Sequence, residues 1–312
     1  MLGMKASIKQ ISTVLKVAIL MATYAALRND SVAQLADRVT GLPIVPTAET
    51  EATPLPSIRL DSESLAEPTL PAAPDPAEQQ AALDQALVEA VVGQNAEAVR
   101  AMLAKGANPD SPLPSPAPDE MADPHRQTSL FYYLKREQNF TVLMMAAGLG
   151  NREIVDLLLK AGANPTAKTK RNKTLAIQLA AKAGDPWIQQ RLLGVDENSP
   201  ANDVSVEVDL ASQTVYVFQN GVMVVTSPIS SGRASHPTPT GTFVVTDRWR
   251  SWMSTIYHVK MPYFLRLSCS EVGLHAGHLP GYPASHGCIR LPKREAKEIF
   301  ETVPLGALVT VR

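Results

Sequence analysis

The spacing of apolar residues changes near residue 203, and this change divides the chain into two kinds of structure. Before this point, apolar side chains recur at the three- to four-residue spacing of one helix face. From Val204 they alternate with polar ones, as in Val204-Ser205-Val206-Glu207-Val208-Asp209, which is typical of a strand with one buried face. We therefore expect a helical region followed by a mostly-β domain at 203–312.

Further strands are expected wherever the alternation returns. Asn220-Gly221 separates two alternating runs and is a strong signal for a two-residue hairpin turn. After Pro292, apolar residues at helical spacing predict one amphipathic helix. The expected strands cover residues 204–209, 214–218, 222–226, 242–246, 257–261, 264–267 and 308–311.

The start of the chain is typical of an export signal. Three lysines precede an apolar, uncharged run at 17–27, which is shorter than the about 20 residues of a membrane-spanning helix. Ser31-Val32-Ala33 supplies small residues for a signal-peptidase site. We expect a signal peptide or N-terminal anchor at 1–33 and a periplasmic or cell-envelope location. An ordinary amphipathic helix is the alternative.

Residues 34–78 form a proline-rich segment with little periodic hydrophobicity. Eight prolines recur there among Thr, Ser, Ala and Glu. Such a composition cannot bury enough apolar surface to offset the entropy lost on ordering. We therefore expect a disordered, semi-stiff linker.

An internal repeat follows at 79–194. The runs 99–109 and 155–165 have apolar residues at helical spacing and end in Gly-Ala-Asn-Pro, where Gly ends a helix and Asn-Pro starts a turn. Helix starts at Thr141 and Thr174 lie 33 residues apart. A period near 33 with two helices per unit resembles the ankyrin repeat.

The ankyrin resemblance predicts a small array of about three units. The two Gly-Ala-Asn-Pro turns are more than one period apart, which indicates an insertion near 111–135 that we expect to be a surface loop. The array either binds a protein partner on a concave face or is a passive spacer for the C-terminal domain.

Reactive side chains are concentrated between residues 273 and 292. This stretch holds three of the six His and one of the two Cys. Cys288 in a Gly-flanked turn fits a nucleophile, because a nearby imidazolium or Arg lowers the pKa of a thiol. The N–H groups of Gly287 and Cys288 are candidate oxyanion donors. Spacing alone leaves open a buried structural cysteine, or a zinc site built from His275, His278, His286 and Cys288.

A specific string lies within this stretch: Ser285-His286-Gly287-Cys288-Ile289-Arg290, preceded by His275 and by Pro237-Thr238-Pro239-Thr240-Gly241-Thr242-Phe243. It resembles the YkuD-type L,D-transpeptidase family over residues 203–312. The resemblance implies a β-sandwich-like domain that acts on bacterial peptidoglycan, in cell-wall organisation and cell shape, without a cofactor or metal.

The resemblance also implies a role for each matching residue. Cys288 matches the nucleophile, which attacks the meso-diaminopimelate carbonyl of a tetrapeptide stem and releases D-alanine. His275 matches the general base, and His286 matches the His before Gly-Cys. The acyl group passes to an amine, giving a 3–3 cross-link. The expected oxyanion- or substrate-binding residues are Gly287, Ser285 and Arg290. For Arg290, the alternative is an ion pair with an acid within the fold.

Several features qualify this match. Only nine residues separate His275 from the Ser-His-Gly-Cys string, so the capping loop is expected to be small, and Ala276 replaces the usual Gly. His278 is a second candidate base. His236 is expected on a turn near the cleft, and His258 is expected to be structural, in a strand.

Cys269 is expected at a strand end as a small buried residue. In an oxidising compartment, a disulfide with Cys288 would silence the nucleophile. Two cysteines are too few for a disulfide scaffold. The net charge of −1 gives no global signal for nucleic acid.

Other functions remain as alternatives. Water as the acceptor would give an L,D-carboxypeptidase, and a lipoprotein amine or a D-amino acid would give tethering or exchange. The chain is alternatively an ankyrin-type interaction protein that only binds peptidoglycan, or a zinc hydrolase. The intact Cys288, His275 and Arg290 argue against a protein that only binds.

Overall fold

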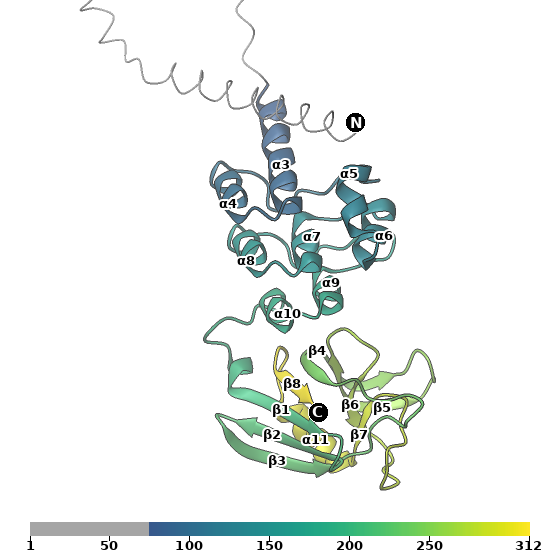
Figure 1. Ribbon diagram of the computed structural model, residues 1–312. Coiled ribbons are helices and arrows are strands. Elements are labelled where there is room, and N and C mark those ends of the chain that lie inside the picture. Colours follow the sequence, from purple (N-terminus) through teal and green to yellow (C-terminus); the bar gives the residue numbers. More distant parts are fainter. Residues whose placement is uncertain (1–74) are drawn as a thin grey trace, which may run out of the picture. The chain divides into compact units, whose positions relative to one another are not determined.

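The computed structural model describes residues 75–312, which form a helical region and a mostly-β region (Figure 1). The predicted signal or anchor at 1–33 and nearly all of the linker at 34–78 lie outside the described residues. The first helix begins at Pro76 with Asp75 as its N-cap, slightly before the predicted start at 79. Within 75–312, no helix is long and apolar enough to cross a membrane.

Three stacked helix pairs make up most of the helical region within residues 75–194. The pairs are α3 (Pro76–Val92) with α4 (Ala96–Ala104), α7 (Val142–Leu149) with α8 (Arg152–Lys160), and α9 (Ala176–Ala183) with α10 (Pro186–Leu192). The first helix of each pair contacts the first helix of the next pair, and the second helices do the same. Each pair therefore buries its apolar face against its neighbours.

The predicted Gly-Ala-Asn-Pro turns follow α4 and α8. Gly106 and Gly162 have φ values of +95° and +92°, the left-handed conformation in which a glycine ends a helix. Asp110, just after the first turn, accepts the Asn164 N–H of the second turn at 2.8 Å. Successive turns are thus tied together as well as similar in sequence.

The insertion near 111–135 is not the surface loop that the prolines predicted. It contains α5 (Asp119–Ala122), the 3₁₀ helix η1 (Asp123–His125) and α6 (Ser129–Arg136). Leu130 is 3% exposed, and a Cβ on Gly148 of α7 would lie 2.4 Å from its Cδ2. Figure 1 shows α6 beside α7, on the side away from α8. The prediction was wrong because apolar residues between the prolines join the helical core.

The mostly-β region contains, among the described residues, one eight-stranded sheet in the order β3-β2-β1-β8-β4-β5-β6-β7. Its strands are β1 (Val204–Asp209), β2 (Thr214–Gln219), β3 (Val222–Pro228), β4 (Gly241–Met253), β5 (Lys260–Leu267), β6 (Gly273–Ala276), β7 (Ile289–Leu291) and β8 (Leu308–Val311). A 3₁₀ helix, η2 (Pro200–Asp203), leads into β1.

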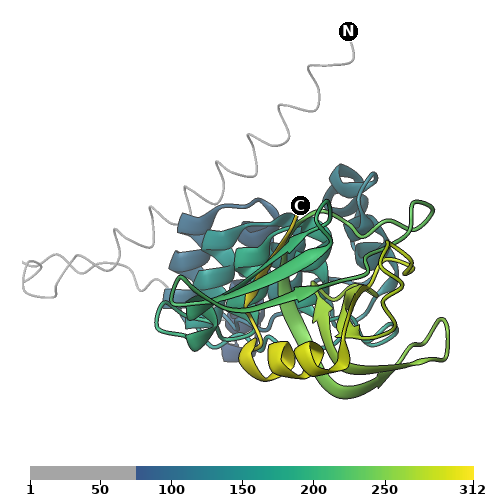
Figure 2. The ribbon, with the colours of Figure 1, turned by 90° about the horizontal axis from the view of Figure 1, so that it is seen from below.

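The long strand β4 joins the two halves of the sheet. Its first residues pair with β8 and its later residues pair with β5, with a register shift between Val245 and Asp247. Both halves contribute to one apolar core, with Val208 from β1, Leu265 from β5 and Ile299 from α11 (Lys293–Thr302). Figure 2 shows α11, in yellow, running across the sheet, where it contacts β3, β5 and β6.

The predicted hairpin and final helix are confirmed, whereas two short strands were missed. Asn220 and Gly221 both have positive φ, +50° and +76°, as a type I′ turn requires. The separate strands predicted at 257–261 and 264–267 are one strand, β5. The sequence pattern gave no expectation for β6 and β7, whose few residues alternate too briefly for a period to be read.

We predict that Leu130→Ala lowers the free energy of unfolding of the helical region by about 2–5 kcal/mol. The loss follows from the cavity that truncation leaves beside Gly148. Urea unfolding followed by circular dichroism at 222 nm measures it. Val222→Ala, at a side chain that is 65% exposed, is the control and should change stability by less than about 0.5 kcal/mol. An equally small loss for Leu130→Ala would mean a loosely attached insertion.

Candidate active site

The reactive stretch is held by two short parallel strands, β6 and β7. Their register pairs Leu274 with Ile289 and His275 with Arg290. Cys288 directly precedes β7 and therefore lies beside the β6 strand that carries His275. Strand pairing thus brings together residues that the sequence separates by a Gly- and Pro-rich loop.

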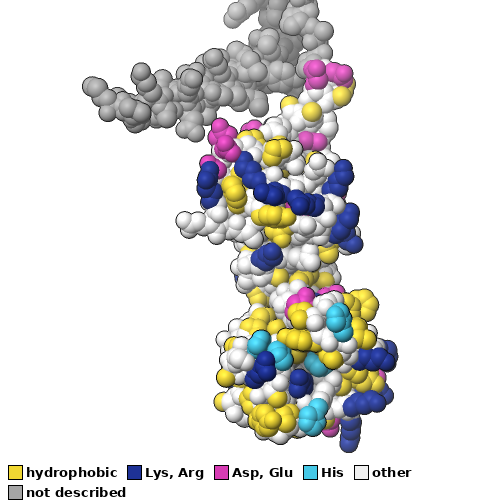
Figure 3. Space-filling view, turned by 90° about the vertical axis from the view of Figure 1, so that its right-hand side faces the viewer, with side chains coloured by type: hydrophobic (Ala, Val, Ile, Leu, Met, Phe, Trp, Pro, Cys, Tyr) yellow, Lys and Arg dark blue, Asp and Glu magenta, His cyan; other side chains and the backbone are white. Residues whose placement is uncertain are grey.

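Most of the predicted site residues line a single cavity of about 400 Å³. Gly287 is not one of its lining residues. Figure 3 shows His side chains gathered on one face of the mostly-β region. The predicted residues on the cavity are His275, Ser285, His286, Cys288 and Arg290.

His275 is a buried imidazole held in one orientation. Its side chain is 7% exposed, and its Nδ1 lies 2.8 Å from the Ala276 carbonyl oxygen. Because a carbonyl oxygen only accepts, Nδ1 carries the proton and Nε2 of the neutral ring is left as an acceptor. Burial lowers the pKa of His275, and the charge of Arg290 lowers it further.

Cys288 is a half-buried free thiol. Its Sγ lies 3.6 Å from the Glu271 carbonyl oxygen, to which it donates. Burial raises the pKa of Cys288, while the Gly273 N–H and Arg290 oppose this effect. The expectation of a thiol pKa lowered by a neighbouring imidazolium is therefore corrected, because His275 is itself kept neutral by burial.

Ser285 shapes the turn that presents the thiol. Its hydroxyl is buried, accepts the Gly287 N–H at 3.1 Å and donates to the Cys288 carbonyl oxygen. Gly287 has a φ of +111°, a conformation that glycine adopts readily and that residues with a Cβ atom disfavour. Thr238 fixes the turn from the other side by donating to the Gly287 carbonyl oxygen at 2.9 Å.

These bonds bear on the oxyanion- and substrate-binding roles expected of two residues. The Gly287 N–H donates to the Ser285 hydroxyl, and it would have to leave this bond to reach a substrate oxyanion. The hydroxyl of Ser285 is equally occupied within the turn. Both residues therefore position Cys288, and their expected role in binding the substrate stays a prediction.

His286 lies exposed at the rim of the cavity. Its Nε2 is 2.7 Å from Arg233 Nη2, and it accepts this bond because a guanidinium only donates. Its ring centroid lies 4.7 Å from the Tyr257 ring and 4.7 Å from the His236 ring. Partial loss of hydration and the charges of Arg233 and His236 lower the pKa of His286.

Arg290 places an unpaired cation on the cavity. Its main chain exchanges two hydrogen bonds of 3.0 Å with Ser230, which anchors the residue. Its side chain passes over Gly277, where an added Cβ would lie 3.0 Å from Arg290 Cγ. No hydrogen bond or ion pair to the guanidinium occurs among residues 75–312.

Other predicted residues lie elsewhere. His278 is exposed and does not line the cavity. His258 has a φ of +52° and lies in the turn before β5, so its predicted strand position was wrong. Cys269 is half-buried in the turn after β5, and it and Cys288 are free thiols. Within the described part of the chain, no three His, Cys, Asp or Glu side chains are placed to hold a metal ion.

The cavity also has lining residues that sequence reasoning missed. Ile256, Tyr257 and Val259, from the turn between β4 and β5, form an exposed apolar lip. Glu271 and Lys260 add one charge of each sign. No local pattern marks these residues, because their role depends on the fold. Thr238, which fixes the turn before Cys288, was also not predicted as a site residue, although it lies within the string that carried the family resemblance.

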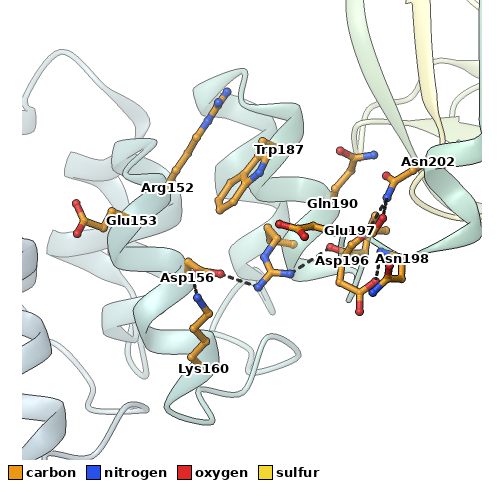
Figure 4. A pocket seen from close by; sticks show the side chains of 12 residues that line it. Arg152, Glu153, Asp156, Lys160, Trp187, Gln190, Asp196, Glu197, Asn198 and Asn202 are labelled. Atoms are coloured by element: carbon orange, nitrogen blue, oxygen red, sulfur yellow. Dashed lines mark hydrogen bonds and ion pairs between the residues drawn. The ribbon is translucent and has the colours of Figure 1, made fainter.

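A larger cavity, of about 700 Å³, lies among α8, α10 and the segment 195–202 (Figure 4). Its charges largely neutralise each other, since Asp156 forms ion pairs of 2.6 Å with both Lys160 and Arg191. No Cys or His lines it. Size alone therefore does not mark the reactive site in this protein.

Comparison with known proteins agrees with the site. Residues 203–311 match the L,D-transpeptidase catalytic domain (YkuD), and residues 138–170 match the ankyrin repeat. The putative L,D-transpeptidase YkuD of Bacillus subtilis is 30% identical over 109 residues, which are 34% of this chain and 64% of that protein. L,D-transpeptidase 1 of Mycobacterium tuberculosis is 29% identical over 119 residues, which are 33% of this chain and 47% of that protein.

A similar solved structure is an L,D-transpeptidase from Mycobacterium tuberculosis H37Rv, which is 27% identical with a TM-score of 0.33 and covers 35% of this chain and 57% of that one. This chain thus spans less than two thirds of the curated relatives it matches. The matched segment coincides with the mostly-β region and contains the whole cavity around Cys288. Residues 203–311 of this chain thus match the YkuD-type L,D-transpeptidase catalytic domain, and the helical region before them contains one match to the ankyrin repeat.

Proposed function

We propose that this protein is a peptidoglycan L,D-transpeptidase in which Cys288 is the nucleophile and His275 the general base. The observation that carries the proposal is their placement on one cavity, with the His275 ring held through Nδ1. Nε2 is then the acceptor for the thiol proton. A cysteine and a histidine arranged in this way suit acyl transfer through a thioester.

The resting pair is neutral in this mechanism. Burial raises the pKa of Cys288 and lowers that of His275, so near neutral pH the proton stays on sulfur. The thiolate forms only as Sγ attacks the substrate carbonyl and Nε2 takes the proton. The Gly273 N–H and Arg290, which both favour the anionic sulfur, stabilise that charge as it develops.

The first half of the reaction converts an amide into a thioester, and the second half converts the thioester into a new amide. Sγ of Cys288 adds to the meso-diaminopimelate carbonyl, and the C–N bond to D-alanine breaks. The proton on His275 passes to the departing amine. In the second half, the acceptor amine attacks the thioester carbonyl and loses a proton to His275, which returns it to the departing Cys288 sulfur.

Arg290 is proposed to orient the donor stem. The terminal D-alanine carries a carboxylate, and a guanidinium binds a carboxylate through two parallel hydrogen bonds. The unpaired guanidinium of Arg290 lies on the same cavity as Cys288, and its residue is opposite His275 in the sheet register. An anionic donor is therefore held close to the reacting pair.

Glu271 supports an amine as the second substrate. It is the one carboxylate among the residues lining the cavity. Its side chain is 63% exposed, and its Oε2 lies 4.0 Å from Arg266 Nη1. A stem amine is an ammonium ion in water, so a carboxylate at the mouth attracts it. This charge favours cross-linking over hydrolysis by water, and a protein that only binds peptidoglycan has no need of the oriented Cys288–His275 pair.

We place this reaction in the cell envelope, on the basis of the basic and apolar residues within 1–33. We also infer that all three helix pairs are ankyrin repeats. The bond from Asn164 to Asp110 and the matching Gly-Ala-Asn-Pro turns support this inference. The helical region is then proposed to hold the enzyme against a partner or its polymeric substrate.

We predict that Cys288 reacts slowly with iodoacetamide near neutral pH. The alkylation rate should rise with pH, and the midpoint of this rise should give an apparent pKa above the ordinary thiol value of about 8.5. The reason is that burial disfavours the thiolate. The measurement uses the Cys269→Ser variant, in which Cys288 is the only thiol, with N-acetylcysteine as the reference. An apparent pKa below about 7 would mean a preformed thiolate–imidazolium pair and contradict the neutral resting state.

Product analysis by mass spectrometry tests the proposed reaction directly. The purified full chain and a disaccharide-tetrapeptide should give a 3–3 linked dimer and free D-alanine. Cys288→Ala should lower product formation at least about a thousandfold, and His275→Ala at least about a hundredfold. Cys269→Ala is the matched control and should remain active.

The products also separate the alternatives. Tripeptide without dimer would make the protein a carboxypeptidase with the same nucleophile. An unchanged substrate with no acyl adduct on Cys288 would reject the enzymatic proposal.

Arg290→Ala should raise the KM for the tetrapeptide donor about 10- to 100-fold, since a hydrogen bond to a charged group contributes about 1.5–3 kcal/mol. Arg290→Lys keeps the charge but loses the two-pronged geometry, so an intermediate KM is expected. Steady-state kinetics with circular dichroism as a check on folding measures both. An unchanged KM in Arg290→Ala would assign donor binding to other residues.

A further inference from the structure

The loop between α8 and α9 carries an unusual density of positive charge. Lys168, Lys170, Arg171 and Lys173 are four cations within six residues, and all four are exposed. Six other cations of the helical region form ion pairs with acids. None of the four loop cations forms an ion pair with any residue between 75 and 312.

This basic loop, residues 168–173, is a built structure. Thr169 and Thr174 close it, since Thr169 N–H donates to the Thr174 carbonyl oxygen and Thr174 N–H donates to Thr169 Oγ1, both at 3.0 Å. The Glu137 carboxylate, 1% exposed, lies beneath it. This carboxylate accepts the N–H groups of Arg171 and Asn172 at 3.2 and 3.3 Å.

Glu137 orders the loop without covering its charged side chains. Its contacts to the loop are main-chain hydrogen bonds, so the cationic ends stay free for a ligand. A fixed loop loses less conformational entropy on binding than a flexible one. The four cations are therefore presented together on an ordered support.

The basic loop belongs to the side of the molecule on which α6 lies, because Asn172 Nδ2 donates to the Tyr132 hydroxyl of α6 at 3.1 Å. Figure 3 views this side and shows a band of Lys and Arg side chains across the helical region. The His side chains of the mostly-β region appear on the same face. A ligand that extends over this face would meet both positive charge and the catalytic domain.

We propose that the basic loop is a second binding site, through which the helical region holds the polyanionic peptidoglycan polymer. This inference rests on the proposed function, which makes the polymer the substrate. Its tetrapeptide stems carry carboxylates repeated along the glycan strand, so four clustered cations meet several anions at once. Each contact is weak alone, and the repetition of anions supplies the avidity.

Sedimentation with purified peptidoglycan sacculi tests the proposal, with the full chain carrying Cys288→Ala so that the polymer is not altered. The test variant is Lys168→Gln/Lys170→Gln/Arg171→Gln/Lys173→Gln. The control variant, Lys105→Gln/Lys293→Gln/Arg294→Gln/Lys297→Gln, removes the same charge from other exposed positions. Circular dichroism and melting temperature confirm that both variants fold.

The test variant should bind sacculi about tenfold or more weakly than the parent, whereas the control variant should bind within about twofold of it. Added salt should weaken binding of the parent more steeply than binding of the test variant. With Cys288 intact, the test variant should lose activity on sacculi but retain it on the soluble disaccharide-tetrapeptide.

Equal binding of the parent and the test variant would overturn the proposal. Sacculus binding that is lost equally in the control variant would also overturn it, since net charge alone would then be responsible. The same variants are also sedimented with vesicles of phosphatidylglycerol and phosphatidylcholine. If the test variant bound sacculi as well as the parent but bound these vesicles more weakly, the proposal would be overturned and the loop assigned to a membrane surface. If the chain with Cys288 intact and the basic loop unchanged were inactive on the soluble disaccharide-tetrapeptide, the proposed function would be rejected, but the sacculus-binding result would still be readable.

Discussion

The parallel pairing of β6 with β7 is the constraint on which the candidate site depends. It fixes His275 opposite Arg290 and sets Cys288 directly before β7. Parallel strands need a crossover, and here the crossover is the segment that ends in the Ser285 turn. The reactive residues therefore come from a strand, a turn and a second strand whose mutual positions are set by main-chain bonds.

Burial then decides the chemistry of the pair. The same loss of hydration penalises both charged forms, so it raises the pKa of the Cys288 thiol and lowers that of the His275 imidazole. A neutral pair is less reactive toward small electrophiles than a thiolate. Placing the charge-stabilising groups, Arg290 and the Gly273 N–H, around the sulfur makes ionisation depend on the substrate that occupies the cavity.

The sequence predicted those parts of the fold whose signal is local. Alternation predicted β1 to β3. Asn220-Gly221 predicted the hairpin between β2 and β3, because turn geometry depends on the residues in the turn. The family string predicted Cys288 and His275 at one cavity. The sequence did not predict that the Ser285 hydroxyl accepts the Gly287 N–H, and Arg233 and Glu271 were missed because only the tertiary fold brings them to the site.

The insertion near 111–135 determines which surfaces of the helical region are open to other molecules. Leu130 of α6 packs on α7, and Lys182 of α9 donates to the Tyr133 hydroxyl of α6 at 3.0 Å. The insertion thus covers a face of the stacked helices and removes it from binding. The turns between repeats remain, and the buried Glu137 at the end of α6 fixes the loop that carries the clustered charge. One insertion therefore both closes one surface and orders another.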